Sequence, residues 1–282
     1  MAFRFTILGS SSSGNAAYLE TPTTRILIDA GLSARQIRQR LLMLGRSPEG
    51  LNGILITHEH GDHVQGLSVL AGKLQIPVYC NRGTRDALSA DLGSSVTFRI
   101  FATGASFDIG DVMIDSFSIP HDAQDPVGYV LRSGNASAGF LTDLGHATRL
   151  VVERVKQVNV LVLEANHDMK LLQDDIRRPW SVKQRIASRH GHLCNDAAAE
   201  VAAQVAGLHL QHLFLGHLSR DCNSPELAER MVRSRLNQVG AHHVQLKVAS
   251  PDTPSATVTL GDWNSTSACP LALQESVVAS TL

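Results

Sequence analysis

A run of apolar residues that leads directly into a cluster of histidines constrains this 282-residue chain more than any other feature. The run Ile54-Leu55-Ile56 is followed by the motif Thr57-His58-Glu59-His60-Gly61-Asp62-His63. A short run rich in β-branched residues is typical of a buried strand. The pattern therefore predicts that the histidines follow the carboxyl end of a strand.

The spacing within this motif favours a metal site. His58 and His60 are two residues apart, so in an extended chain their rings point the same way, and a turn at Gly61 brings Asp62 and His63 back over them. Imidazoles together with a carboxylate are the ligands of hydrolytic Zn²⁺ or Mn²⁺ sites. A solvated loop that holds three histidines by chance is the alternative, and it is disfavoured because histidine is scarce.

Composition and charge restrict the binding partners and the cellular compartment expected for this chain. Hydrophobic residues make up 43%, charged residues 18%, and the net charge is −1, so binding of a polyanion requires a local basic patch. No apolar segment is long enough to span a bilayer. The first eight residues alternate and are too short for a signal peptide, and four dispersed cysteines suit a reducing compartment. We expect a cytoplasmic protein without membrane contact.

Helix and strand patterns alternate along the chain, which indicates an α/β (α+β) fold. Ser33 resembles a helix N-cap, and Ser224 followed by Pro225 begins another helix. We expect strands near residues 3–8, 16–20, 25–28, 54–56, 77–79, 106–118, 127–132, 137–141, 160–163, 212–215 and 244–249. Expected helices cover 33–44, 67–75, 82–90, 148–158, 181–188, 196–205 and 225–239. Residues 1–250 form the predicted catalytic domain, and residues 251–282 form a predicted tail that is partly disordered.

Further polar residues directly follow expected strands. They are His121, Asp143, the segment Glu164-Ala165-Asn166-His167-Asp168, and His217. In α/β folds the carboxyl ends of strands carry ligands and catalytic groups. We therefore expect these residues to gather near the histidine motif.

His-x-His-x-Asp-His after a strand resembles the metal-binding motif of the metallo-β-lactamase superfamily. More narrowly, several motifs resemble the bacterial YycJ (WalJ) type, a branch associated with 5′ to 3′ exonuclease activity on DNA. These motifs are Gly9-Ser-Ser-Ser-Ser-Gly-Asn15, Asp29-Ala-Gly-Leu-Ser33, Thr142-Asp-Leu-Gly145, Gly191-His-Leu-Cys-Asn195 and Gly216-His-Leu-Ser219. The resemblance implies a four-layer αββα sandwich. Only 73 residues lie between Asp143 and His217, which leaves no room for a β-CASP insertion.

The same resemblance implies two divalent metal ions, Zn²⁺ or Mn²⁺, and assigns their ligands. His58, His60 and His121 match the ligands of the first ion. Asp62, His63 and His217 match those of the second, and Asp143 matches the carboxylate that bridges both. Two such ions share a hydroxide and stabilise the attacking and leaving oxygens of a phosphodiester displacement.

Roles for other residues follow from this chemistry. We expect Asp62 and Asp143 to act in catalysis, with His192 and His167 as candidate proton donors. Asn166, His167, His192, Asn195 and Ser219 are candidate substrate contacts. Asp29, Asp122 and Glu59 are candidates to orient the metal-binding rings. The basic stretch from Arg177 to Arg189 is expected to flank the site and to contact DNA phosphates.

Other functions remain open at this point. A hydrolase of the same superfamily that acts on a small phosphodiester, a thioester or a lactam has the same metal ligands. An RNA nuclease and a non-catalytic scaffold that keeps the fold are further alternatives. The predicted function is a metal-dependent exonuclease acting on DNA.

Overall fold

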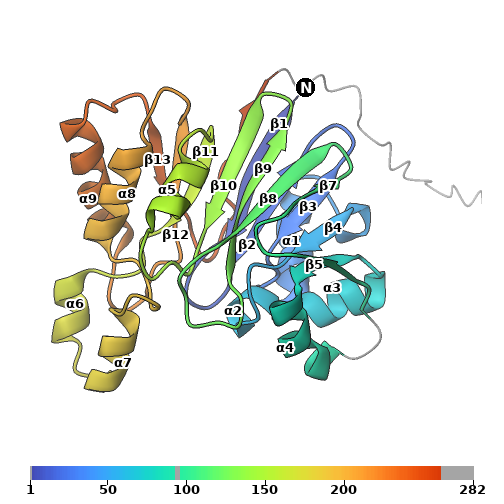
Figure 1. Ribbon diagram of the computed structural model, residues 1–282, viewed down its shortest axis with the longest axis horizontal. Helices are drawn as coiled ribbons and strands as arrows, with labels where there is room; N and C mark the ends of the chain where they lie inside the picture. The colour runs from blue at the N-terminus through green and yellow to red at the C-terminus, as the bar shows by residue number, and fades with distance from the viewer. Residues whose placement is uncertain (1, 93–95, 262–282) are drawn as a thin grey trace, which may run out of the picture.

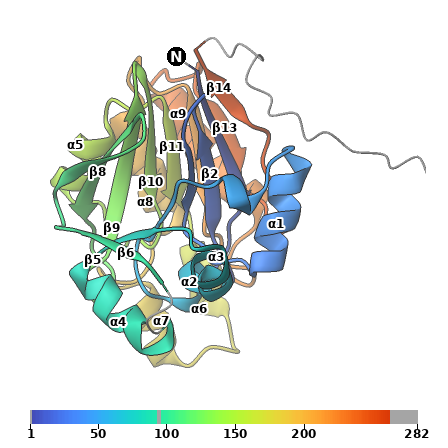
Figure 2. The same cartoon turned by 90° about the vertical axis from the view of Figure 1, so that its right-hand side faces the viewer.

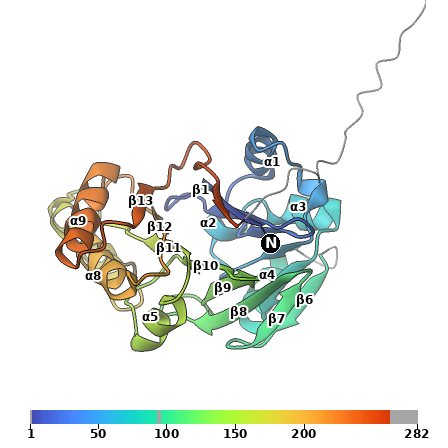
Figure 3. The ribbon, with the colours of Figure 1, turned by 90° about the horizontal axis from the view of Figure 1, so that it is seen from above.

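Two seven-stranded β-sheets pack face to face, and helices cover both outer faces (Figures 1 and 3). The structure is a computed structural model that describes residues 2–92 and 96–261. The arrangement confirms the predicted four-layer αββα sandwich and shows how residues far apart in sequence meet at one end of the sheets.

The first sheet has the strand order β14-β1-β2-β3-β4-β5-β6. Strands β1 to β3 are antiparallel, whereas β3 to β6 run parallel. Their bounds are β1 Phe3–Gly9, β2 Ala16–Glu20, β3 Arg25–Ile28, β4 Gly53–Leu55, β5 Val78–Asn81, β6 Phe98–Phe101 and β14 Val258–Leu260.

The second sheet has the order β13-β12-β11-β10-β9-β8-β7. Strands β10 to β13 are parallel, so their carboxyl ends lie at the same edge. Their bounds are β7 Ser106–Ile109, β8 Val112–Ser118, β9 Val127–Ser133, β10 Ala136–Leu141, β11 Val160–Glu164, β12 His212–Gly216 and β13 Gln245–Val248.

Three apolar clusters hold the layers together. Successive side chains of a strand face opposite sides of its sheet, so one strand contributes both to the core between the sheets and to an outer cluster under the helices. In β3, Ile26 and Ile28 join the core between the sheets with Tyr129 and Phe214. Leu27, between them, faces the outer helices instead. Strands buried on both faces read as continuous apolar runs, which is why the sequence predicted most of them.

Helices fill the outer layers. On the first sheet lie α1 Ala34–Met43, α3 Leu67–Leu74 and α4 Arg82–Leu92, and on the second α5 Arg149–Val155, α8 Asn195–Val205 and α9 Pro225–Gln238. Ser33 forms a capping box with Gln36, and Ser224 caps α9 with Pro225 at its first position. Both helix starts confirm the predictions. The short segments are η1 Pro48–Gly50, α2 Gly61–Val64, α6 Met169–Asp174 and α7 Trp180–Ile186.

The first sheet extends beyond residue 250, where the sequence set the end of the domain. Strand β14 pairs with β1, with Phe3 opposite Leu260. Val258 and Leu260 are buried in the core between the sheets. Residues 251–260 therefore belong to the folded domain rather than to a tail, and residues 262–282 of the predicted tail lie outside the described residues. Within the described part of the chain, no helix has the length and apolar character needed to cross a membrane.

Candidate metal centre

Three residues within two positions of the end of a strand have the left-handed backbone conformation. Asp29 follows β3 with φ 57°, Asp143 lies just beyond β10 with φ 56°, and His217 follows β12 with φ 56°. This conformation is unfavourable for residues other than glycine, and such strain gathers at functional sites. The turn at each position directs a polar side chain to the same edge of the sandwich.

The histidine motif lies at that edge. His58 and His60 follow β4, and Asp62 and His63 lie in the short helix α2. Gly31 permits this placement, because a Cβ atom there would lie 1.6 Å from the carbonyl oxygen of Asp62. The backbone amide of Asn15 donates a hydrogen bond to that same oxygen at 2.8 Å, which holds α2 against the loop after β1.

The seven predicted ligands converge in two groups. One consists of His58, His60 and His121, and the other of Asp62, His63, Asp143 and His217. Within each group the candidate ligand atoms lie within 4.8 Å of one another. Oδ2 of Asp143 is 2.9 Å from Nε2 of His63, while Oδ1 is 3.6 Å from Nε2 of His121. Asp143 thus faces both groups, as expected of a carboxylate that bridges two ions.

Hydrogen bonds to Nδ1 fix the orientation of three rings. Nδ1 of His63 lies 2.8 Å from Asp29, Nδ1 of His217 lies 2.7 Å from Glu164, and Nδ1 of His121 lies 3.0 Å from the carbonyl oxygen of Gly191. A proton on Nδ1 leaves the lone pair of Nε2 directed into the site. Such partners are the usual means of fixing a metal-binding imidazole.

Burial and charge also suit a cation. Burial and the neighbouring rings lower the pKa of His58 well below its ordinary value, so that ring is neutral. Its Nε2 is buried without a hydrogen-bond partner. Nitrogen and carboxylate donors of this kind suit Zn²⁺ or Mn²⁺. The residues therefore fit divalent metal ions.

Of the three carboxylates expected to orient rings, Asp29 contacts His63 in this way. Asp122 lies 3.3 Å from Nε2 of His121 and is paired with Arg185. Glu59 instead accepts a hydrogen bond from the Gln124 amide and contacts none of these rings in any described hydrogen bond or ion pair.

The sequence predicted that Glu164 lies near the histidine motif but gave it no specific role, and the structure places it behind the site. Its carboxylate is fully buried and lies within 2.8 Å of Nδ1 of both His192 and His217. Burial opposes its ionisation, but the two rings lower its pKa to about 2. An acidic residue at the end of a fully apolar strand was the available signal, because an isolated buried carboxylate is costly.

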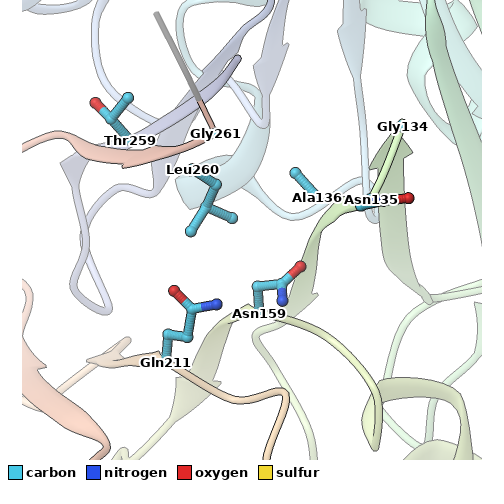
Figure 4. A pocket seen from close by; sticks show the side chains of 8 residues that line it. All are labelled: Gly134, Asn135, Ala136, Asn159, Gln211, Thr259, Leu260 and Gly261. Atoms are coloured by element: carbon cyan, nitrogen blue, oxygen red, sulfur yellow. The ribbon is translucent and has the colours of Figure 1, made fainter. Parts of the chain in front are cut away.

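An open cavity of about 190 Å³ lies over the two groups. Ser12, Asp122, Arg185 and His192 line it together with predicted ligands. A second cavity of about 290 Å³ shares Ser12 and His192 with the first. Its other lining residues are Ser13, Asn166, Arg178, Ile186, Ser219, Arg220 and Asp221. A larger cavity of about 530 Å³, lined by residues such as Asn159 and Leu260, contains no acidic, histidine or cysteine side chain (Figure 4).

The structure separates the candidate substrate residues into two sets. His192, Asn166 and Ser219 line the second cavity. The Glu164 carboxylate outweighs the effect of burial and raises the pKa of His192 above its ordinary value. Asn195 is fully buried in a paired amide contact with Asn223, and His167 is 1% exposed, so neither lines these two cavities. Their contact with substrate stays a prediction.

The basic segment flanks the site, but carboxylates already neutralise much of it. Arg178 and Arg177 are paired with Asp175 and Asp221, and Arg185 is paired with Asp122. Arg220 was not predicted. It is exposed, lines the second cavity, and has no carboxylate partner among the described ion pairs.

Comparisons with known proteins agree with this geometry. The model of the beta-lactamase superfamily domain matches residues 24–217. The chain is 38% identical over 242 residues to exodeoxyribonuclease YycJ of Bacillus anthracis, covering 85% of this chain and 91% of the relative. It is 39% identical over 260 residues to exodeoxyribonuclease WalJ of Streptococcus pneumoniae, covering 90% and 96%.

The chain belongs to the metallo-β-lactamase superfamily. Solved structures show the same fold. The metallo-β-lactamase fold protein YhfI of Bacillus subtilis has a TM-score of 0.69 at 12% identity, covering 90% of this chain and 99% of that one. Zn²⁺-bound PqqB of Methylobacterium extorquens has a TM-score of 0.68 at 16% identity, covering 92% and 99%. The predicted superfamily and its YycJ (WalJ) branch are confirmed, and the chain is a metal-dependent hydrolase.

Proposed function

We propose that this chain is a 5′ to 3′ exonuclease that hydrolyses DNA with two divalent metal ions, Zn²⁺ or Mn²⁺. The observation that carries the proposal is the meeting of the two ligand groups at Asp143, beneath a cavity that shares Ser12 and His192 with a second one. The identity of 38–39% to proteins named exodeoxyribonucleases supports DNA as the substrate.

In this proposal His58, His60 and His121 would hold one ion, Asp62, His63 and His217 would hold the other, and Asp143 would be available to both. When bound, such ions polarise a phosphodiester and lower the pKa of water. The chain contributes the orientation of the ligands. Asp29 and Glu164 keep protons on Nδ1 of His63 and His217, which preserves Nε2 as the donor atom.

His192 is the residue proposed to move a proton. Its Nδ1 is held by Glu164 at 2.8 Å, Nε2 has no hydrogen bond among those described, and the ring lines both cavities. A protonated Nε2 at that position can donate to the leaving 3′ oxygen. Asp62, which also lines the first cavity, is proposed to orient the attacking water.

The second cavity is proposed to hold the nucleotide beside the scissile bond. Asn166, Ser219 and Arg220 offer an amide, a hydroxyl and a guanidinium that suit a phosphate and a sugar. Asn195 is proposed to act indirectly, because its partner Asn223 donates to the backbone oxygen of Asn166 at 3.1 Å.

The test is an assay of purified protein loaded with Mn²⁺ or Zn²⁺ on end-labelled single-stranded and duplex DNA and RNA. Release of mononucleotides from the 5′ end of DNA supports the proposal. Turnover of small phosphodiesters, thioesters or lactams without any hydrolysis of DNA would indicate that the chain has another activity of the superfamily. No turnover of any of these substrates would indicate a scaffold. Cytoplasmic localisation stays a prediction.

A further inference from the structure

Arg185 is the only arginine or lysine among the described residues that line the first cavity, which lies over both ligand groups. It belongs to the last turn of α7, a helix at the same end of the molecule as α2 (Figures 1 and 2). Its side chain is 68% exposed. Arginine presents its N–H donors in a planar fork that matches the oxygens of a phosphate. The first cavity therefore offers one guanidinium where the scissile phosphate is proposed to bind.

The backbone at Arg185 is fixed to the site. The carbonyl oxygen of Ile186 accepts a hydrogen bond from the His192 amide at 2.9 Å. Gly191 allows this close approach, because a Cβ atom there would lie 2.2 Å from the carbonyl oxygens of Arg185 and Ile186. Nδ1 of His121 donates to the carbonyl oxygen of Gly191 at 3.0 Å. Arg185 is thus held beside a predicted metal ligand and the proposed proton donor.

The ion pair with Asp122 orients the side chain without using it up. Nε of Arg185 lies 2.5 Å from Oδ2 of Asp122, which also lines the first cavity. Neither Nη1 nor Nη2 of Arg185 takes part in any described hydrogen bond or ion pair. An arginine has five N–H donors, and four of them are on these two terminal nitrogens. The guanidinium can therefore bind a phosphate oxygen while it stays paired with Asp122.

Neighbouring cations differ from Arg185 in this respect. Arg178 lines the second cavity, but its Nη1 is paired with Asp175 and its Nη2 with Asp221. Nζ of Lys183 donates to a backbone oxygen at 2.7 Å, and Lys183 lines neither the first nor the second cavity. Within the basic segment, Arg185 is thus the cation whose place and available donors suit the reacting phosphate.

We propose that Arg185 is a catalytic residue that binds a non-bridging oxygen of the scissile phosphate through Nη1 or Nη2. The inference rests on the proposed function and adds a residue outside the predicted metal ligands. As the attacking oxygen bonds to phosphorus, negative charge gathers on the non-bridging oxygens, so donors aimed at them bind the transition state more tightly than the substrate. Arg185 transfers no proton, because the leaving 3′ oxygen takes its proton from His192.

The first experiment measures single-turnover hydrolysis of a DNA 20-mer in Mn²⁺. Arg185→Ala should lower the rate constant at saturating protein about 100- to 1,000-fold, as is typical when one donor to the developing charge is lost. The protein concentration that gives half the maximal rate should change by a smaller factor. Arg185→Lys should restore only part of the rate, because an ammonium lacks the planar fork.

Arg38→Ala is the matched control for this comparison. Arg38 is exposed, is paired with Glu49 at the same 2.5 Å, and lines neither the first nor the second cavity. Its rate constant should equal that of wild type. Metal analysis and circular dichroism of Arg185→Ala should also match wild type, because Arg185 contacts no predicted ligand in the described hydrogen bonds and ion pairs.

Asp122→Asn separates a phosphate contact from a structural ion pair. A pair that only joins α7 to the loop between β8 and β9 predicts equal losses of rate in Asp122→Asn and Arg185→Ala, since each variant lacks one partner. A phosphate contact predicts that Asp122→Asn keeps a rate constant at least about tenfold above that of Arg185→Ala, because the guanidinium is still present.

A second experiment changes the phosphate instead of the arginine. One non-bridging oxygen of the scissile phosphate is replaced by sulfur, a weak hydrogen-bond acceptor, in each of the two diastereomers. We expect one diastereomer to slow wild type but to cause no further slowing in Arg185→Ala. The other should slow both proteins by the same factor. Loss of additivity for one diastereomer identifies a direct contact.

Three outcomes overturn the inference while wild type degrades DNA. The first is an Arg185→Ala variant with the wild-type rate constant. The second is an equal loss of rate in Arg185→Ala and Asp122→Asn. The third is a pair of diastereomers that slow Arg185→Ala by the same factors as wild type. Failure of the proposed function is a separate result, because the wild-type enzyme then hydrolyses no DNA.

Discussion

Oε1 of the Glu164 carboxylate lies 2.7 Å from Nδ1 of His217 and fixes this ring with Nε2 3.1 Å from Asp62. The same oxygen lies 2.8 Å from Nδ1 of His192. Oε2 accepts the backbone amides of Leu144 and Leu193. One buried carboxylate therefore joins a predicted metal ligand, a proposed proton donor and the loops that follow β10 and precede α8.

Replacement of Glu164 by Gln should weaken metal binding. The amide of Gln accepts at only one atom, so it cannot serve both rings and two backbone amides. We expect the affinity for Zn²⁺ or Mn²⁺ to fall about 10- to 100-fold, as is typical when such a partner is lost. Competition with a chelating dye measures the change. Glu153→Gln, on the outer face of α5, is the control. Equal affinities in both variants would contradict the role of Glu164.

Metal analysis of the wild-type protein should give two ions per chain.

Asp143→Ala and His60→Ala should lose nearly all turnover, because Asp143 faces both ligand groups and His60 belongs to one of them. Their circular dichroism should match wild type, since three apolar clusters hold the sandwich without the site. Unfolded variants would indicate a structural metal site, and a saturated protein with one ion would exclude the dinuclear assignment.

The sequence predicted which residues gather at the site, because each carries its own local signal. Each lies at the end of an apolar run, and the spacing within residues 58–63 carries the chemistry. Partners that are distant in sequence were harder to predict. Glu164 acts on a ring 53 residues away. The carboxylates that neutralise Arg178 and Arg185, Asp221 and Asp122, are 43 and 63 residues away. Strand β14 was missed because it is three residues long within a segment rich in Ser, Thr and Pro.

Arg220 should contribute one phosphate contact. It lines the second cavity and has no carboxylate partner among the described ion pairs, whereas Arg178, which lines the same cavity, is paired with Asp221. Arg220→Ala should weaken DNA binding and reduce the slope of log affinity against log salt by about one. Arg230→Ala, an exposed position on α9, should leave the slope unchanged. Fluorescence anisotropy at several salt concentrations measures both. Identical slopes in the two variants would show that Arg220 makes no contact with a DNA phosphate.

The pH dependence of stability should depend on Glu20, far from the metal ligands. Its side chain is 3% exposed and binds Arg46 through both oxygens at 2.6 and 2.7 Å, while Tyr18 donates to it at 2.7 Å. Burial opposes ionisation, but the Arg46 guanidinium and the Tyr18 hydroxyl together lower the pKa of Glu20 below its ordinary value. A lowered carboxyl pKa stabilises the fold above the unfolded value of about 4.3, and this stability is lost as pH falls through the folded pKa.

Glu20→Gln should therefore lower the free energy of unfolding by about 2 kcal/mol at pH 7, the typical contribution of a charged hydrogen bond. The difference from wild type should shrink as the pH falls below about 4. Urea unfolding at pH 7, 5 and 3.5 measures it. Glu49→Gln is the matched control, because the Glu49 pair with Arg38 is about half exposed and such pairs contribute little at any pH. A loss of stability at Glu20 that stays constant across this range would assign the effect to packing instead of charge.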